Sequence, residues 1–418
     1  MKTNIVNRWI LALAGVFMQL ALGAVYAWSV FRIPLNQTYG WTVSQVTVAF
    51  EIAILVLGFA AFAGGLWMRR TGPRRVAIVA AVLYGLGTAL AGTSHSLPML
   101  YLTYGVIAGA GLGLGYIVPV ATLVRWFPDK RGLITGIAVA GFGAGALITA
   151  PIAQRLISSV GVSGTFMILG IAYFAIITLA ATVMKNPPEG YAPRGFHPSS
   201  VRGSAARDFT LRQALGTWQW YGLWLTLFLN STTGIAIISQ ASPMAQEISH
   251  VSAVIAAGLV GIISIANGSG RFLWAWFSDA IGRKSVFLAM LLLQAAAFLL
   301  LSHVSGFASL AVLAFMILLC YGGGFGTMPA FAADYFGTKD IGSIYGLMLT
   351  AWGAAGVVGP TLIAYVRQAT GEYQGALRIM ALIALFSAIV PLLLHPPVVR
   401  RTASVRDNNV ARGLASRA

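Results

Sequence analysis

The segment Trp67–Arg75, WMRRTGPRR, joins two long apolar runs, and a related segment, Phe277–Lys284 or FSDAIGRK, does the same about 210 residues later. A second pair of related segments lies at 125–136 and 334–346, where an aromatic pair is followed by a glycine. Apolar runs and polar loops therefore recur in the same order. Such an internal repeat predicts two similar halves that meet at a common interface.

The composition requires a membrane as the solvent for most of the chain. Of 418 residues, 58% are hydrophobic and 9% are charged, whereas soluble domains carry roughly 25% charged residues. A soluble fold of this size cannot bury so much apolar surface. We therefore expect an all-α integral membrane protein.

Twelve apolar runs of about 20 residues are each long enough to cross a hydrocarbon core roughly 30 Å thick. We place them at 9–31, 44–68, 76–93, 98–124, 132–156, 164–184, 218–244, 252–278, 285–303, 307–333, 342–366 and 375–394. The sequence thus predicts an N-terminal six-helix bundle at 1–184, a linker at 185–217, a C-terminal six-helix bundle at 218–396 and a tail at 397–418. Within the linker, Phe209–Leu215 has an amphipathic pattern.

The distribution of Lys and Arg orients these predicted helices. Of the 27 basic residues, 22 lie in the termini, the linker and alternate short loops. The opposite helix ends hold four, namely Arg32, Arg155, Arg367 and Arg378. By the positive-inside rule, both termini, the linker and the tail are cytoplasmic. Because the net charge of +17 resides in these loops and tails, we expect no nucleic-acid partner.

The residue types that carry most enzyme chemistry are scattered along the chain. Cys320 is the single cysteine, which excludes a disulfide framework and a Cys-based metal cluster. The five histidines lie in loops and at helix ends. A receptor or sensor would need an output domain, but only about two dozen residues follow His395. We therefore expect no enzyme active site, no cofactor and no metal site.

The two related loops resemble the signature Gly-x-x-x-Asp-Arg-x-Gly-Arg-Arg of the major facilitator superfamily. The fitting residues are Gly65, Arg70, Gly72, Arg74 and Arg75 in the first loop and Asp279, Gly282, Arg283 and Lys284 in the second. Arg69 stands where the signature has Asp, and the second loop lacks the first glycine and one arginine. The resemblance implies twelve helices that transport by alternating access, with gating loops at Arg70, Gly72, Arg74, Asp279, Gly282 and Arg283.

Several separated motifs narrow this resemblance. The residues that fit the monocarboxylate transporter pattern are 126–133, Gly136, Ala138, Ala140 and Gly141. The segments 7–9, 125–132 and 271–283 look closer still to bacterial oxalate/formate antiporters. The resemblance implies a small carboxylate anion as substrate and a bacterial cytoplasmic (inner) membrane as the location. We expect a monomer surrounded by membrane lipid.

Arg271 is a cation within a predicted span, about 5 residues or 7–8 Å from the middle of the eighth run. A guanidinium keeps its proton, so at this depth it needs a counter-charge or a water-filled cavity. Its planar fork can bind a carboxylate bidentately. Asn267, one turn earlier, adds a polar group to the same helix face. Alternatively, Arg271 extends toward the cytoplasmic end or pairs with Asp279, two turns on.

Aromatic side chains are the candidates for the walls of this site. Those near the middle of predicted spans are Tyr26, Trp28, Tyr116, Tyr321, Phe325 and Trp352. Aromatics in a span more often contact lipid or the protein core than a ligand. The resemblance to oxalate/formate antiporters implies that Tyr26, Tyr116, Tyr321 and Phe325 line the anion site. We interpret the central Gln19 and Asn230 as polar contacts between helices.

Trp352 departs from the pattern of dicarboxylate-carrying relatives, which have a lysine at this place in the eleventh span. With Arg271 as the one fixed cation, a second buried carboxylate would remain unpaired at a cost of several kcal/mol. We therefore expect a monocarboxylate of lactate or pyruvate size. The predicted substrate-binding residues are Arg271, Asn267, Tyr26, Tyr116, Tyr321, Phe325 and Trp352.

A proton is the expected second partner, because moving a monovalent anion with one proton carries no net charge across the membrane. Monocarboxylate relatives have an Asp at the position of Asn267, which cannot titrate. Of ten acidic residues only Glu51 lies clearly within a span, where burial would let it hold a proton at neutral pH. Alternatively, Glu51 lines a wet outer vestibule or bonds to a neighbour. Antiport of the oxalate/formate type is the alternative to proton symport.

Overall fold

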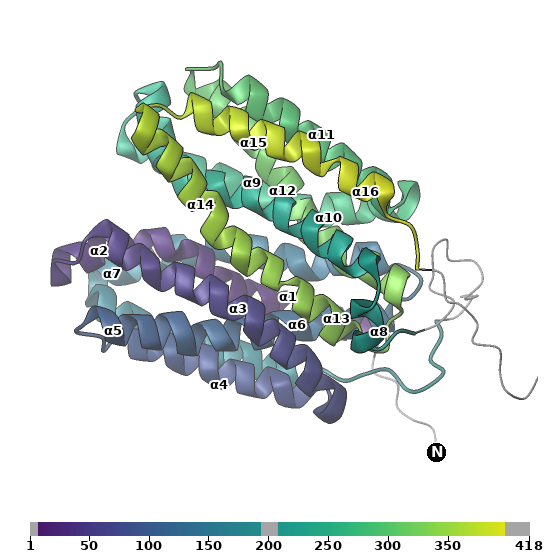
Figure 1. The fold of residues 1–418 in the computed structure, drawn as a ribbon. Coiled ribbons are helices and arrows are strands. Elements are labelled where there is room, and N and C mark those ends of the chain that lie inside the picture. Colours follow the sequence, from purple (N-terminus) through teal and green to yellow (C-terminus); the bar gives the residue numbers. More distant parts are fainter. Residues whose placement is uncertain (1–6, 194–207, 398–418) are drawn as a thin grey trace, which may run out of the picture.

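A computed structural model describes residues 7–193 and 208–397 of the chain, which are helices joined by short loops without any β-strand in those two ranges. The helices lie side by side in two groups, one formed by α1–α7 and the other by α9–α16 (Figure 1). The expected linker 185–217 and tail 397–418 fall partly outside the described residues, at 194–207 and 398–418.

The first group makes six passes through the bundle. Its elements are α1 (Arg8–Gly23), η1 (Ala24–Trp28), α2 (Ser29–Tyr39), α3 (Val43–Thr71), α4 (Pro73–Ala91), α5 (Leu97–Leu100), η2 (Tyr101–Ala108), α6 (Gly109–Trp126) and α7 (Arg131–Val183). The elements α1–α2 follow one another as one pass, and α5–α6 as another. Helix α7 contains two passes because Gly161, at φ +74°, breaks its helical geometry.

The second group also makes six passes, after the short helix α8 (Leu211–Leu215). Its elements are α9 (Trp218–Ser249), α10 (Ala253–Ile281), α11 (Arg283–Leu301), α12 (Phe307–Phe336), α13 (Ile341–Met348), α14 (Thr350–Thr370), α15 (Gln374–Ser387) and α16 (Ile389–Leu393). The predicted first and seventh spans ended at 31 and 244, whereas the helical passes continue to Tyr39 and Ser249. In these two passes the helical hydrogen bonds continue beyond the apolar residues, so the hydropathy pattern underestimates the length of the helix.

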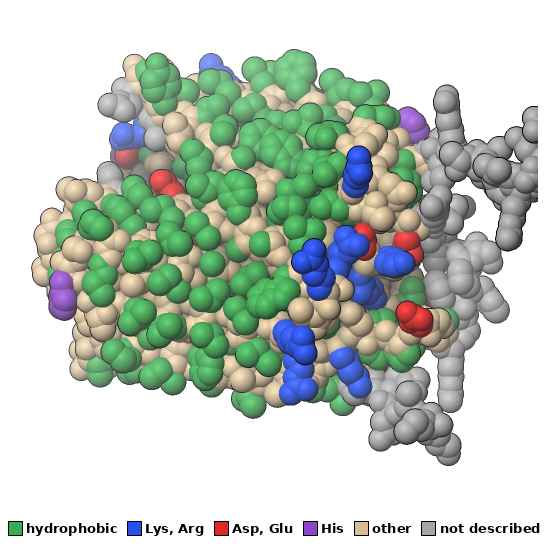
Figure 2. Space-filling model, turned by 60° about the horizontal axis from the view of Figure 1, so that its bottom comes forward, with side chains coloured by type: hydrophobic (Ala, Val, Ile, Leu, Met, Phe, Trp, Pro, Cys, Tyr) green, Lys and Arg blue, Asp and Glu red, His purple; other side chains and the backbone are tan. Residues whose placement is uncertain are grey.

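Eleven of the described helical segments are apolar and long enough to cross a membrane. Their outward faces carry exposed side chains such as Phe59, Leu86, Leu102 and Leu179, and Figure 2 shows apolar side chains covering the flank of the molecule. Helix α10 is not among the eleven, although its 29 residues are long enough to cross a membrane. The prediction of an all-α membrane protein with twelve spanning helices is confirmed.

Lys and Arg side chains gather at one end of the molecule (Figure 2). This end, called the basic end below, holds the loops 69–75, 127–131, 279–284 and 337–340. Between the two groups of helices, α7 packs against α10, and α3 packs against α13 and α14. These two contacts form the seams at which the halves meet.

Candidate functional site

Arg271 is completely buried on α10, with none of its surface exposed. Its Nε donates to Oδ1 of Asn267 at 3.2 Å, one turn earlier on the same helix. Neither Nη1 nor Nη2 has a hydrogen-bond partner among the residues that the structure describes. A buried guanidinium with two free donors is costly unless a ligand completes its bonding.

Asp279 does not neutralise Arg271. Its carboxylate forms an ion pair with Arg283 at 2.6 Å and accepts the N–H groups of Gly132 and Leu133 at 3.0 and 2.8 Å. The interpretation of Arg271 as a snorkelling or Asp279-paired residue therefore does not fit the structure.

Two phenylalanines flank the Arg271 guanidinium. Its Cζ lies 5.1 Å from the ring centre of Phe142 on α7 and 4.9 Å from that of Phe325 on α12. Both distances are within the range of a cation–π interaction. Because Phe142 belongs to the first half and Phe325 to the second, the cation sits at the interface of the halves.

Trp352, fully buried on α14, lies at the centre of this aromatic group. Its ring centre is 4.8 Å from Phe325, 5.8 Å from Phe142, 5.9 Å from Tyr116 and 6.3 Å from Tyr26. We call these rings, together with Tyr321 and Tyr345, the aromatic cage. Tyr321 belongs to it because its ring packs 5.1 Å from Phe325.

The cage presents several hydrogen-bond donors around the guanidinium. The hydroxyls of Tyr116 and Tyr345 and the indole N–H of Trp352 have no hydrogen-bond partner among the described residues. The Tyr345 side chain adjoins that of Tyr116, which places it in the cage. Tyr26 and Tyr321 approach each other across the halves, with 3.5 Å between their hydroxyl oxygens. Such a set of donors around one fixed cation matches the needs of a small anion.

Polar contacts behind the cage hold two of its tyrosines. Gln19 on α1 donates to the backbone carbonyl of Tyr116 at 3.2 Å. Asn230 on α9 donates to the carbonyl of Tyr321 at 3.3 Å, and Gln294 on α11 donates to Asn230 at 3.0 Å. Gln19 and Asn230 thus join helices, as the sequence interpretation expected.

The structure brings seven predicted binding residues together, namely Arg271, Asn267, Tyr26, Tyr116, Tyr321, Phe325 and Trp352. Sequence reasoning missed Phe142 and Tyr345. Phe142 follows directly after Gly141 of the monocarboxylate-like motif, so this position next to the motif could have indicated that Phe142 lies at the site.

Trp28 lies outside the cage. Its ring packs 4.1 Å from Tyr104 and 6.1 Å from Phe166, and its indole N–H donates to the carbonyl of Val46 at 3.2 Å. Trp28 therefore packs in the protein core, which is the interpretation that the sequence favours for an aromatic in a span without support from the resemblance. Element η1 is a 3₁₀-helix with about three residues per turn, so the backbone rotates by about 240° over the two residues after Tyr26, and the two rings point in different directions.

Glu51 is half-buried on α3 and is not part of the aromatic cage. Glu51 lies one turn before Leu55 and two turns before Gly58. Leu55 approaches Gly353 of α14, and Gly58 approaches Leu349, the residue directly before α14. Glu51 is therefore on the seam-facing side of α3, farther from the basic end than the contacts with α14. No hydrogen bond or ion pair of Glu51 occurs with the side chains that the structure describes.

At the basic end, the Asp279 side chain joins the two halves, and Arg283 holds it from within the second half. Asp279 closes the first turn of α7 through the N–H groups of Gly132 and Leu133, where a helix N-terminus favours negative charge. Arg283 pairs with Asp279 and, at 2.9 Å, with Asp334 on α12. Gly282 adopts φ +91° at this junction, which favours glycine.

The related junction in the first half has the opposite arrangement of charge. Arg69, which stands in place of the signature Asp, forms an ion pair with Asp340 at 3.0 Å across the halves. Asp340 directly precedes α13. The first loop lacks the signature carboxylate, and Asp340 from the other half supplies one in its place. Arg125 adds to this contact between the halves by donating to the carbonyls of Thr338 and Lys339.

The remaining residues of the predicted gating loop occupy the turn between α3 and α4. Gly72 has φ +80° there. Arg70 and Arg74 are exposed and form no ion pair with the described residues. Their charges add to the basic end.

No group of three or more His, Cys, Asp or Glu residues within 7–193 and 208–397 could hold a metal ion. The cage itself offers the Arg271 cation and the neutral donors of its tyrosines and Trp352.

Comparisons with known proteins agree with this architecture. The sequence profile of the Major Facilitator Superfamily matches residues 11–276 and 259–415. The chain is 31% identical over 356 residues to the uncharacterized MFS-type transporter YhjX of Escherichia coli, covering 84% of this chain and 86% of that protein. It is 28% identical over 356 residues to the oxalate:formate antiporter of Oxalobacter formigenes, covering 84% and 83%.

A crystal structure of the E. coli fucose:proton symporter FucP has the same fold. It superimposes with a TM-score of 0.70 over 92% of this chain and 97% of that one, at 18% sequence identity. The relatives and the fold are those of transporters, which are not enzymes. The family profile and the identity to YhjX establish that the chain belongs to the major facilitator superfamily.

Proposed function

We propose that this protein is a secondary active transporter of small monocarboxylates of lactate or pyruvate size, which it moves by alternating access. The observation that carries the proposal is the Arg271 guanidinium, buried with both Nη groups unpaired inside an aromatic cage built by both halves. A carboxylate supplies two acceptor oxygens in the geometry of the fork. Because both halves contribute to the cage, a bound anion contacts both of them.

One fixed cation in the cage supports a monocarboxylate over a dicarboxylate. Trp352 provides a neutral N–H donor where a second cation would be needed. A second carboxylate buried against Trp352 and the tyrosines would receive hydrogen bonds but no charge, and breaking or omitting one partner of a buried pair costs about 3–5 kcal/mol.

Antiport of an organic anion is the second candidate, favoured by the similarity to the oxalate:formate antiporter. Proton symport is favoured by charge balance, because a monovalent anion that crosses together with one proton carries no net charge across the membrane. Glu51 is the candidate proton carrier in the symport scheme. It is half-buried on the side of α3 that faces the seam with α14, and it is the carboxylate of that span.

We infer that the protein resides in a bacterial cytoplasmic membrane as a monomer, with the basic end in the cytoplasm. The excess of Lys and Arg at that end supports this orientation. The Arg69–Asp340 ion pair and the hydrogen bonds from the Gly132 and Leu133 N–H groups to Asp279 cross between the halves at this end, which supports a state in which the cytoplasmic side is closed.

Counterflow in proteoliposomes tests the substrate and the coupling together. Vesicles loaded with unlabelled lactate should accumulate labelled lactate and pyruvate, with weak competition from oxalate and none from a sugar of similar size. If oxalate competes as well as lactate, the monocarboxylate assignment fails. If uptake requires internal anion and ignores a pH gradient, the protein is an antiporter.

A further inference from the structure

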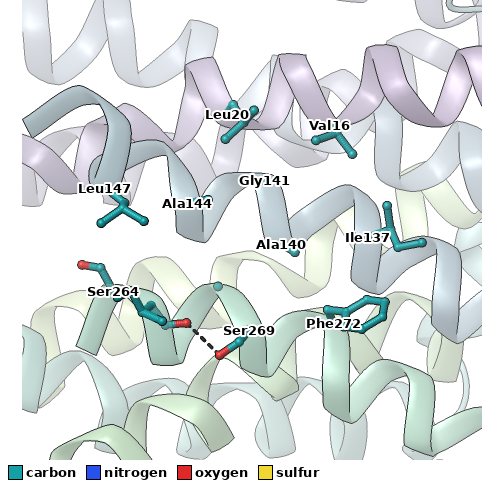
Figure 3. Close-up of a pocket in the computed structure, with 12 residues that line it drawn as sticks. Val16, Leu20, Ile137, Ala140, Gly141, Ala144, Leu147, Ser264, Ser269 and Phe272 are labelled. Carbon is teal, nitrogen blue, oxygen red and sulfur yellow. Dashed lines mark hydrogen bonds between the residues drawn. The ribbon is translucent and has the colours of Figure 1, made fainter. Parts of the chain in front are cut away.

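A groove of about 460 Å³ lies between the halves on the side of α10 away from the aromatic cage. Its walls come from α1, α7 and α10, so it belongs to both halves (Figure 3). Leu20 and Ala144 line the side of the first half, and Ser269 and Phe272 line the side of the second. The volume falls in the range of small-molecule sites.

The walls of the groove offer no free polar group. Ser264 donates to the carbonyl of Val260 at 2.7 Å, and Ser269 donates to the carbonyl of Ile265 at 2.8 Å. Figure 3 shows the Ser269 bond running back to its own helix. The other lining residues are aliphatic, glycine or phenylalanine. An occupant therefore gains apolar contact here but no hydrogen bond or charge pairing.

The position of the groove determines what can reach it. Leu147 and Ile265, which line it, are 46% and 49% exposed, and neighbouring Leu13 and Phe17 on α1 are also exposed. These side chains belong to the apolar surface of the helices, so the groove opens onto the hydrocarbon of the bilayer. It also lies near the middle of α10, about 15 Å from either membrane surface, where lipid headgroups do not reach.

We propose that this groove binds a hydrocarbon chain of a membrane lipid, lodged between α7 and α10. In this state of the protein, the close crossing of these helices at Gly143 and Gly268 sets the separation of the walls, so the helices do not close the bare groove themselves. An empty apolar groove would leave its lining without contact partners, whereas each buried methylene of a lipid chain contributes about 0.8 kcal/mol.

A lipid chain in this groove would be affected by the movement of the halves during transport. Helix α7 belongs to the first half and α10 to the second, and Phe272 and Gly268 directly adjoin Arg271 and Asn267 in sequence. When the halves rotate, the distance between α7 and α10 changes, and the chain must move or leave. The groove is therefore a site at which acyl-chain composition acts on the transporter.

Photolabelling with a phospholipid that carries a diazirine in the middle of one acyl chain tests this proposal. The full-length protein is illuminated in nanodiscs, and adducts are mapped by peptide mass spectrometry. Leu147 and Ile265 should each be labelled at least threefold more than Leu292, which lies mid-helix on α11 and is 43% exposed to ordinary surrounding lipid.

Filling the groove should remove the excess labelling. Ala144→Phe places a ring into the groove, while Ala296→Phe makes the same change on the exposed face of α11. Labelling of Ile265 should fall to the level of Leu292 in the first variant and stay unchanged in the second. Ala140→Leu provides a smaller filling change if Ala144→Phe does not fold. Equal labelling of Ile265 and Leu292 in the unmodified protein, or excess labelling that persists in a folded filled variant, would overturn the assignment.

Discussion

Replacing Arg271 by Met should abolish transport while leaving the empty protein nearly as stable as before. Met keeps the length and apolar stem of the side chain but removes the guanidinium. A bidentate carboxylate contact consists of two hydrogen bonds to a charged group, each contributing about 1.5–3 kcal/mol. Their loss amounts to about 3–6 kcal/mol, or about 10²–10⁴-fold in affinity at 1.4 kcal/mol per factor of ten.

The effect on stability is expected to be small because two contributions oppose each other. The substitution removes two unsatisfied Nη groups, each of which costs about 1–3 kcal/mol in the empty protein. It also removes cation–π contacts with Phe142 and Phe325, at about 0.5–2 kcal/mol each, and the bond to Asn267. An arginine in a buried ion pair behaves differently, since breaking that pair costs about 3–5 kcal/mol.

Two measurements on purified protein separate these cases. Counterflow of labelled lactate in proteoliposomes reports transport, and thermal unfolding with and without lactate reports stability and binding. Arg271→Met should give no counterflow, an unfolding temperature within a few degrees of the original, and no shift on adding lactate. Arg271→Lys should recover little transport, because a single ammonium lacks the fork. Arg155→Met, at an exposed arginine, is the matched control.

Either of two results would refute this reasoning. Near-normal counterflow by Arg271→Met would show that the guanidinium does not hold the substrate. A fall in unfolding temperature by ten degrees or more, with low abundance in the membrane, would show that Arg271 is a structural residue whose loss prevents folding.

Three further predictions test selectivity, coupling and the closed basic end. Trp352→Lys should raise competition by oxalate relative to lactate in counterflow, since the second carboxylate gains a cation opposite Arg271; an unchanged ratio would contradict the one-cation argument. An inward pH gradient should accelerate lactate uptake, and Glu51→Gln should weaken that acceleration more than it weakens exchange at equal pH; full coupling in the variant would place the proton elsewhere. Arg69→Asp should lower uptake about fivefold, because the pair between the partly exposed Arg69 and the buried Asp340 contributes about 1 kcal/mol. Adding Asp340→Arg should restore most of the uptake; a double variant no better than the single one would show that this pair does not stabilise the closed end.

The fold could be predicted from local properties of the chain. The evidence came from short stretches of sequence, namely the twelve apolar runs, the positive residues between them and the repeat of 67–75 at 277–284. In a membrane, an apolar run long enough to span the bilayer forms a helix, because all its backbone hydrogen bonds must be made within the segment. The limits of this approach appear at the ends of helices, where Tyr39 and Ser249 extend the predicted spans.

One residue of the site could be predicted because its charge does not suit its apolar surroundings. Arg271 is a permanent charge within an apolar run, and its need for a partner is evident without any coordinates. The resemblance to carboxylate transporters then indicated most of the surrounding aromatics. It did not indicate Phe142 or Tyr345, because the direction of a side chain depends on how its helix is rotated against the others.

What the sequence by itself determined is the membrane fold, the two related halves and the buried cation in the eighth helix. Only the tertiary structure decided that Phe142 and Tyr345 join the aromatic cage, that Arg69 pairs with Asp340, and that α7 and α10 leave a groove open to lipid. Each of these depends on contacts between residues that are far apart along the chain. Hydropathy and charge act on each segment separately, whereas such contacts arise only when the packing of all the helices fixes their rotation and depth.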